Sequence, residues 1–139
     1  MAEASTDQDL KEGFEIHLSQ THWHVERIEE MAGLLGLDLT EHTCKAMQKL
    51  IEEGENLIAE GLEPAVRDAA IINTARRVEH FEISAYGIVA ALAGRLGHDE
   101  VEALARDTLE EEEETEAQLV NLAETAGTND NYTGDTLNV

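Results

Sequence analysis

The stretch of sequence that decides the fold is RRVEHFEISAYG, residues 76–87, because it combines a helical apolar pattern with two glutamates. Counting outward from Glu82 in alternating steps of three and four residues gives an apolar stripe made of Ile71, Ala75, Val78, Ala85, Val89, Leu92 and Leu96. Glu79 lies one turn before Glu82 and about 60° around the helix from it. A buried carboxylate without a partner is costly. The pattern therefore predicts a core helix whose two carboxylates reach the same volume and share a partner there.

The length and composition of the chain indicate one all-α domain. A chain of 139 residues is long enough for one hydrophobic core and too short for two ordinary ones. Its apolar residues recur at helical rather than alternating spacing, and it contains a single proline, Pro64. We predict a helical domain over residues 9–126, preceded by a flexible N-terminus (1–8) and followed by a disordered tail (127–139).

The chain is predicted to form four helices, over residues 9–35, 40–60, 65–96 and 99–126. Thr40 and Asp99 are the expected N-caps of the second and fourth helices, and Gly97 is expected to end the third. Cys44, in the first turn of the second helix, is expected to be a small buried residue. The second helix is also expected to bury Met47, Leu50, Ile51, Leu57 and Ile58. Because the connections are short, consecutive helices are expected to be antiparallel neighbours in a four-helix bundle.

Polar side chains interrupt the apolar stripe halfway along three of these helices. They are His17, Gln20, Thr21 and His24 in the first helix, Glu79 and Glu82 in the third, and Glu112 in the fourth, with Glu111 and Thr115 beside it. Antiparallel helices of similar length bring their midpoints together, so these side chains are expected to form one polar layer across the bundle. Carboxylates with one or two imidazoles suit iron or manganese, whose charge would offset the cost of burying them. The pattern therefore predicts a metal site in the middle of the bundle.

Several of these candidates also have a simpler interpretation. Two glutamates three residues apart are common on solvated helices, so Glu79 is equally compatible with an exposed position. Glu82 lies on the stripe itself, which favours a buried role. A core-facing histidine is more often hydrogen-bonded than metal-bound, and this applies to both His17 and His24. Among the glutamates at 110–114, the helical register selects Glu112 alone.

The charge of the chain is its most extreme feature, with 31 acidic residues against nine basic ones and a net charge of −22. Such a surface repels nucleic acid and anionic membranes. It also destabilises a compact chain by self-repulsion unless salt screens the charges, so a salt-rich cytoplasm is the favoured explanation. An unusually acidic mesophilic protein or a cationic partner are the alternatives. The sequence contains no apolar stretch long enough for a membrane span or a signal peptide, so we expect a soluble, cytoplasmic protein.

Four segments resemble, in the same order, the ferritin-like YciE/YciF family. They are FEIHLSQTHWHVERIE (14–29), CKAMQKLIEEG (44–54), VRDAAIINTARRVEHFEISAYG (66–87) and TLEEEEETEAQLVNLA (108–123). The resemblance covers about residues 10–124. It implies a four-helix ferritin-like bundle, usually dimeric, with a di-iron or related metal centre and a stress-linked role.

The resemblance also implies roles for individual residues. Glu79 and Glu82 match the paired glutamates of a core helix. Glu112 matches a glutamate of the last core helix, and His17 and His24 match the polar face of the helix that contains the HL-x-x-T pattern. The sequence departs from the family at two points. Gln20 stands where a glutamate usually precedes the threonine, and the additional first helix of the family, with its own candidate glutamate ligand, is missing from the sequence.

Two functions are compatible with these features. The first is a ferritin-like metal-binding protein with a di-iron or manganese carboxylate centre, for which catalysis is an open question. The alternative is a metal-free helical dimer that acts as a structural or interaction module. In either case we expect a homodimer, because the missing helix leaves an apolar face to be covered unless the second helix folds into its place. Trp23, Met31 and Leu34 of the first helix are the expected contact residues, and His17 and His24 of both chains would then share one site.

Overall fold

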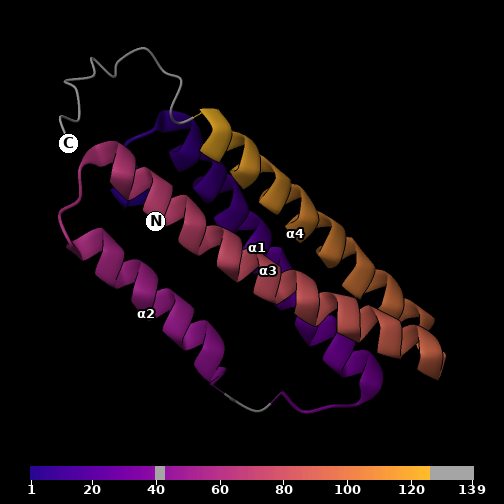
Figure 1. Cartoon of the computed structure of the whole chain (residues 1–139). Coiled ribbons are helices and arrows are strands. Elements are labelled where there is room, and N and C mark those ends of the chain that lie inside the picture. Colours follow the sequence, from indigo (N-terminus) through magenta and orange to yellow (C-terminus); the bar gives the residue numbers. More distant parts are fainter. Residues whose placement is uncertain (40–42, 126–139) are drawn as a thin grey trace.

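The computed structural model describes residues 1–39 and 43–125. It contains a short 3-10 helix, η1 (Ala2–Ala4), and four α-helices: α1 (Gln8–Leu35), α2 (Lys45–Ala59), α3 (Pro64–Leu96) and α4 (Asp99–Thr125). Consecutive helices run antiparallel (Figure 1), and the described residues include no strand. The predicted all-α, antiparallel four-helix fold is confirmed. None of the described helices carries an apolar stretch long enough to cross a membrane.

The ends of the helices follow from local backbone chemistry. The Asp7 side chain accepts a hydrogen bond from the backbone N–H of Leu10 (3.0 Å), which caps α1. Gly97 ends α3 with φ of 77°, a left-handed conformation that glycine adopts without steric cost. Pro64 is the first residue of α3, where its missing N–H has no helical partner to lose. Asp99, the expected N-cap of the fourth helix, is instead the first helical residue of α4.

The second helix is shorter and less buried than we predicted. It begins at Lys45 with Cys44 as its N-cap, and the expected N-cap, Thr40, lies outside the described residues. Cys44 is exposed, so the prediction of a buried cysteine is wrong. Ile51 is also exposed, and the other apolar residues expected to be buried, Met47, Leu50, Leu57 and Ile58, are only half-buried. The physical reason is that α3 is the one helix with which α2 makes a main contact among the described residues, so only one side of α2 is covered.

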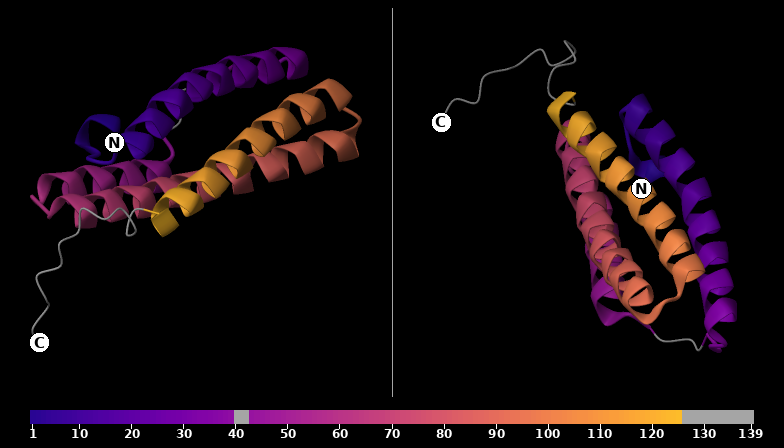
Figure 2. Two further views of the ribbon diagram at one scale, coloured as in Figure 1. Left: turned by 90° about the horizontal axis from the view of Figure 1, so that it is seen from above. Right: turned by 90° about the vertical axis from the view of Figure 1, so that its right-hand side faces the viewer.

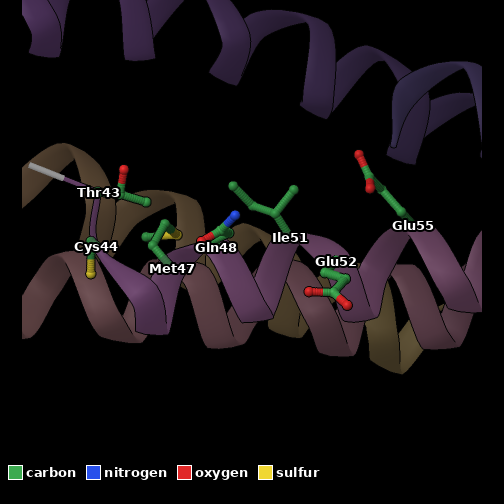
Figure 3. A pocket seen from close by; sticks show the side chains of 7 residues that line it. All are labelled: Thr43, Cys44, Met47, Gln48, Ile51, Glu52 and Glu55. Atoms are coloured by element: carbon green, nitrogen blue, oxygen red, sulfur yellow. The ribbon is translucent and has the colours of Figure 1, made fainter. Parts of the chain in front are cut away.

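The helices do not form a closed square. The right-hand view of Figure 2 shows α4 between α3 and α1, and the main helix contacts are α3 with α4, α2 with α3, and α1 with α4. A pocket of about 450 Å³ is lined by residues of α2 and the segment before it. In Figure 3, Ile51 and Glu55 point from α2 into the space on the side of α1. α1 and α2 are therefore not among the main helix contacts, whereas a closed bundle would pack them as a pair.

The apolar core is divided into two clusters. One contains Met31, Tyr86, Ala90, Ala93, Val101 and Ala105. The other contains Leu10, Ile72, Ala75 and Leu119. The buried polar residues His24, Glu79, Thr108, Glu112 and Thr115 come from positions between these clusters along α1, α3 and α4. The predicted polar layer is therefore present, with an apolar cluster on either side of it.

The buried face of α3 differs from the predicted stripe. Glu79 is buried with 2% of its surface exposed, whereas Glu82 is half-buried and Val89, Leu92 and Leu96 are exposed. The prediction that Glu82 occupies the centre of the core face is therefore wrong. The physical reason is that α3 is apolar on two sides, so its periodicity alone could not show which side contacts α4.

The first residues of the chain, which we expected to be flexible, make specific contacts with α3. Ala2–Ala4 form the turn of η1. The backbone N–H groups of Thr6 and Asp7 both donate hydrogen bonds to the carboxylate of Asp68, at 2.9 Å each. Asp68 is itself buried. These hydrogen bonds hold the segment before α1 against the beginning of α3. The tail predicted for residues 127–139 lies outside the described residues.

The contact between α2 and α3 depends on Gly54, and this gives a testable prediction. Gly54 is buried, and a Cβ atom at this position would lie 2.9 Å from Cγ2 of the fully buried Thr74. We expect Gly54→Ala to push α2 away from α3 and to lower the free energy of unfolding by about 1–3 kcal/mol. Urea unfolding followed by circular dichroism measures this change.

Gly87→Ala is the matched control for this substitution. Gly87 is also in the interior of a helix, but a Cβ there has no other atom within 4 Å. Alanine has the higher helix propensity, so this variant is expected to gain up to about 1 kcal/mol. Equal stabilities of the two variants would show that α2 does not pack closely against Thr74.

Candidate metal centre

Three helices bring potential metal ligands together in the polar layer. His17 comes from α1, Glu79 from α3 and Glu112 from α4, and each offers one ligand atom within 4.8 Å of the others. Nε2 of His17 lies 3.3 Å from Oε1 of Glu79. Among the histidine, cysteine, aspartate and glutamate side chains of the described residues, this group has the spacing of a metal site. Of the six predicted ligands, it contains three.

The two carboxylates of this cluster are buried without sufficient hydrogen-bond donors. Glu79 is 2% exposed and Glu112 is 1% exposed. Oε2 of Glu79 and both carboxylate oxygens of Glu112 lack a hydrogen-bond donor of good geometry among the described residues. Burying an unpaired carboxylate oxygen is unfavourable, so either a proton or a cation must compensate the charge here. The donor set, two carboxylates and one imidazole, fits iron or manganese.

The hydrogen bonds of His17 direct one ring nitrogen toward the carboxylates. The hydroxyl of Thr115 donates to the backbone carbonyl of Glu111 (3.0 Å), and Nδ1 of His17 lies 3.3 Å from the same hydroxyl oxygen. We therefore assign the ring proton to Nδ1, which donates to Thr115 and leaves the Nε2 lone pair facing Glu79. A lone pair opposite a carboxylate oxygen is repulsive unless a proton or a metal ion lies between them. This arrangement supports a cation at the centre of the cluster.

Burial changes the protonation of these groups in the metal-free protein. Burial, together with the neighbouring Glu112, raises the pKa of Glu79 to about 9. The same two causes raise the pKa of Glu82 to about 7, partly offset by His24. Burial lowers the pKa of His17 below its ordinary value, although Glu112 and a hydrogen bond to Gln20 oppose this effect. His17 is consequently neutral near pH 7, which is the form of imidazole that binds metals.

His24 has a different environment from His17. Its Nε2 lies 2.7 Å from Oε2 of Glu111, and its Nδ1 lies 3.0 Å from Oε1 of Glu112. Burial disfavours a charged ring, but the hydrogen bonds and charges of Glu112 and Glu111 outweigh it and raise the pKa of His24 above its ordinary value. Both ring nitrogens thus face carboxylates.

An arginine at the edge of the layer supports this histidine. Arg27 binds Glu111 with both of its terminal nitrogens, at 2.7 Å each, and donates a further hydrogen bond to Thr108 (3.2 Å). The guanidinium of Arg27 is the main reason why the pKa of Glu111 is below its usual range. Sequence reasoning placed Glu111 and Thr115 beside Glu112 in the polar layer but did not find Arg27. The available signal for Arg27 was its three-residue spacing from His24.

Two predicted ligands lie beside the cluster rather than in it. Glu82 is half-buried, one turn after Glu79, and close enough to Glu112 for their charges to interact. Gln20 is half-buried and hydrogen-bonds with His17. The structure therefore brings all six predicted residues into one region, with His17, Glu79 and Glu112 at its centre.

Comparison with known proteins places the chain in a family. The family model described as "Domain of unknown function (DUF892)" matches residues 1–132. The chain belongs to the DUF892 family. One member is protein YciF of Escherichia coli strain K12, which is 40% identical over 124 residues, corresponding to 88% of this chain and 75% of YciF. The resemblance to YciE/YciF proteins noted from the sequence is thereby confirmed.

Solved structures show the same fold. The crystal structure of the E. coli stress protein YciF superposes with a TM-score of 0.88 at 38% identity, covering 91% of this chain and 80% of that one. The structure of YcfI from Rhodopseudomonas palustris superposes with a TM-score of 0.81 at 34% identity, and the match covers 86% of this chain and 76% of YcfI. The description of YcfI provisionally calls it a structural protein. The DUF892 chain described here is therefore a ferritin-like four-helix bundle.

Proposed function

We propose that this protein binds iron or manganese in the polar layer, with His17, Glu79 and Glu112 as ligands. The observation that carries the proposal is the convergence of these three side chains from three helices around carboxylate oxygens that are buried and lack hydrogen-bond donors. A divalent cation supplies the missing positive charge, and it accepts both carboxylate and imidazole ligands. Placing inward-pointing glutamates and histidines on facing helices is how helical bundles bind such metals.

Further potential ligands lie beside the proposed ligand set. Three ligands do not fill the coordination sphere of iron or manganese, and we propose that Glu82 and Gln20 bind a second ion or water molecules beside the first. Glu82 contributes a third carboxylate, and Gln20 contributes a neutral oxygen where the family usually has a glutamate. Bound iron or manganese would supply redox chemistry toward oxygen or peroxide. The protein's own part is to hold the ligands, compensate their charges and keep the site shielded from water.

The setting that we propose is the cytoplasm of a cell with high internal salt, where the protein handles iron or oxidants. The net charge of −22 supports this setting, since repulsion among so many like charges destabilises a compact chain unless salt screens it. The description of E. coli YciF as a stress protein is compatible with handling oxidants. Whether the bound metal catalyses a reaction or is only stored is a separate question, which turnover assays with peroxide would answer.

Metal binding can be tested with two neighbouring glutamates of α4. Glu112 is buried in the cluster, whereas Glu113 is exposed. We expect Mn²⁺ to bind the wild-type protein and Glu113→Gln with equal affinity, and Glu112→Gln at least about tenfold more weakly, because it loses a charged ligand. Isothermal titration calorimetry on protein freed of metal by chelation measures all three. Equal affinities for the two variants would place the metal elsewhere, and the absence of binding to the wild type would refute the proposal.

A second candidate function is a structural or interaction module that acts as a dimer. It is favoured by the apolar side chains that α1 and α3 expose, and by the provisional structural role given to YcfI. The exposed residues include Trp23, Val25 and Leu34 on α1 and Phe81, Ile88, Val89, Leu92 and Leu96 on α3. Met31, which we expected in the dimer contact, is buried in the core of the chain itself. The proposed homodimer therefore uses the exposed residues and not Met31.

The dimer can be tested with charges on two sides of α3. Leu92 and Ala91 are adjacent and exposed, but they point in directions about 100° apart on the helix. We expect the wild type to sediment as a dimer in molar KCl, Leu92→Asp to dissociate, and Ala91→Asp to stay dimeric, because a buried unpaired charge at an interface is costly. A wild-type monomer at micromolar concentration would exclude the dimer and any site shared between two chains.

A further inference from the structure

The three proposed ligands differ in how they can be reached from solvent. His17 has the most accessible side chain, with 17% of its surface exposed, against 3% for Glu79 and 1% for Glu112. Beside His17 lies a cavity of about 440 Å³, which we call the η1 cavity. Its walls come from the first residues of the chain and from α1: Met1, Ala2, Glu3, Phe14, His17, Leu18 and Thr21. Solvent therefore approaches the two buried carboxylates from the side of His17.

The size of the η1 cavity suits a hydrated metal ion. Six water molecules around Mn²⁺ occupy roughly 180 Å³, at about 30 Å³ each in the liquid. His17 also borders a cavity between α1 and α4, but that cavity measures only about 10 Å³, which is too small for more than one water molecule. Glu3 adds a carboxylate to the η1 cavity, and a carboxylate attracts cations. Of these two cavities, the η1 cavity is the one through which an ion can pass.

The residues before α1 form one wall of the η1 cavity and are held at two points. In the left-hand view of Figure 2 this start of the chain, marked N, lies between α1 and the helices α2 and α3. The buried carboxylate of Asp68 accepts hydrogen bonds from the backbone N–H groups of Thr6 and Asp7, at 2.9 Å each, and from the hydroxyl of Thr6. Cε of Met1 lies 3.4 Å from the position that a Cβ would take on Gly54 of α2. These contacts with α3 and α2 fix the width of the cavity.

We propose that the η1 cavity is the route by which divalent metal ions reach and leave the cluster of His17, Glu79 and Glu112, and that the Asp68 hydrogen bonds limit the rate of passage. This inference rests on the proposed metal function. A route changes the rates of metal uptake and release by the same factor and leaves the Kd unchanged, because it lowers a barrier without altering the bound state. A change in the ligands alters the Kd. Measuring exchange rates together with the Kd therefore separates access from binding.

Two substitutions of similar size on α1 test the route with Mn²⁺. Leu18 lines the η1 cavity, whereas Ile16, which is exposed to a similar extent, points about 160° away from Leu18 around the helix. We expect Leu18→Trp to slow both the uptake of Mn²⁺ and its release to excess chelator severalfold at an unchanged Kd, because the larger side chain narrows the cavity. Ile16→Trp should exchange Mn²⁺ at the wild-type rate. Equal exchange rates in the two variants would overturn the inference and leave the metal function intact.

Removing the Asp68 hydrogen bonds should have the opposite effect. Losing one hydrogen bond to a charged group shifts an equilibrium by about tenfold or more, so we expect Asp68→Ala to exchange Mn²⁺ at least about tenfold faster than the wild type at an unchanged Kd. Glu60→Ala, which removes an exposed carboxylate, is the control and should exchange Mn²⁺ at the wild-type rate. Circular dichroism checks that both variants keep their helical content. A folded Asp68→Ala with the wild-type exchange rate would show that this wall does not limit passage.

Labelling of histidines in the metal-free protein gives a readout that does not depend on metal binding. Diethyl pyrocarbonate modifies accessible imidazoles, and tandem mass spectrometry of peptides resolves each histidine. Relative to the exposed His22, we expect His17 to be labelled more slowly in Leu18→Trp and faster in Asp68→Ala. Equal labelling of His17 in the wild type and both variants would show that the η1 cavity is not the way to His17. If the wild type binds no Mn²⁺, the proposed function fails, and the metal route fails with it.

Discussion

Replacing Glu79 with glutamine is expected to have opposite effects on stability with and without metal. In the metal-free folded protein, burial and Glu112 raise the pKa of Glu79 from its ordinary value of 4.5 to about 9. Between these pH values the folded protein keeps a proton that the unfolded chain releases. The contribution of Glu79 to the free energy of unfolding is therefore fully present below pH 4.5 and is lost as the pH rises toward 9. Glutamine does not ionise, so the variant escapes this loss.

The expected result at pH 8 in the presence of a chelator is a Tm for Glu79→Gln that exceeds the wild-type Tm by about 5 °C or more. At pH 5 the difference should nearly vanish, because Glu79 then holds its proton at little cost. Adding Mn²⁺ at pH 8 should reverse the order, since metal stabilises a folded state that binds it. The wild type gains this stabilisation, and Glu79→Gln, which lacks a ligand, gains far less.

Differential scanning calorimetry at the two pH values, with chelator and with Mn²⁺, provides all the comparisons. Glu113→Gln is the control, because its exposed carboxylate should change neither the pH dependence nor the response to metal. A Glu79→Gln variant that is less stable than the wild type in chelator at pH 8 would show that the carboxylate is not held protonated in the core. An unchanged response to Mn²⁺ would show that Glu79 is not a ligand.

Raising the KCl concentration from 0.1 M to 1 M is expected to raise the Tm of the metal-free protein by about 10 °C or more. The nine basic residues can pair with only nine of the 31 acidic ones, so most carboxylates repel each other without compensation. The Debye length falls from about 10 Å to about 3 Å over this range, which screens repulsion between surface charges. Salt also weakens exposed ion pairs such as Arg77 with Glu53, but exposed pairs contribute little.

Variants with fewer surface charges test the cause of this salt effect. Glu110, Glu113 and Glu114 form an exposed acidic cluster on α4. Replacing all three with glutamine should raise the Tm at 0.1 M KCl and reduce the gain obtained at 1 M. A wild-type Tm that is flat between the two salt concentrations would contradict the high-salt interpretation of the composition. An equal gain in the triple variant would show that the salt acts in another way than by screening these charges.

Most of the helical architecture could be predicted because it depends on local chemistry. The end of α3 at Gly97 and the position of Pro64 at its start follow from the backbone preferences of single residues. The first helix, predicted from residue 9, begins one residue earlier, after the Asp7 cap. The register of α4 was predictable for another reason. Its acidic residues leave one continuous face for burial, so Thr108, Glu112 and Thr115 could be assigned to the core.

The tertiary structure was needed to assign the buried face wherever a helix has two faces with apolar residues. On α3 both Glu79 and Glu82 lie beside apolar residues, and only the contact with α4 selects Glu79 as the buried carboxylate. Similarly, the sequence could not show that α2 covers one part of α3 and leaves Leu92 and Leu96 exposed. Burial is decided by which helices meet, and this information is not contained in the periodicity of one helix.

For the candidate site, the sequence by itself determined which residue types reach the middle of the bundle, because helical spacing places His17, His24 and Glu112 on inward faces. It could not distinguish the two histidines, which lie seven residues apart on the same face of α1. Only the packing of α4 against α1 places Glu111 and Glu112 on either side of His24 and leaves Nε2 of His17 facing Glu79. The role of each side chain depends on neighbours from other helices, and those neighbours are set by tertiary contacts.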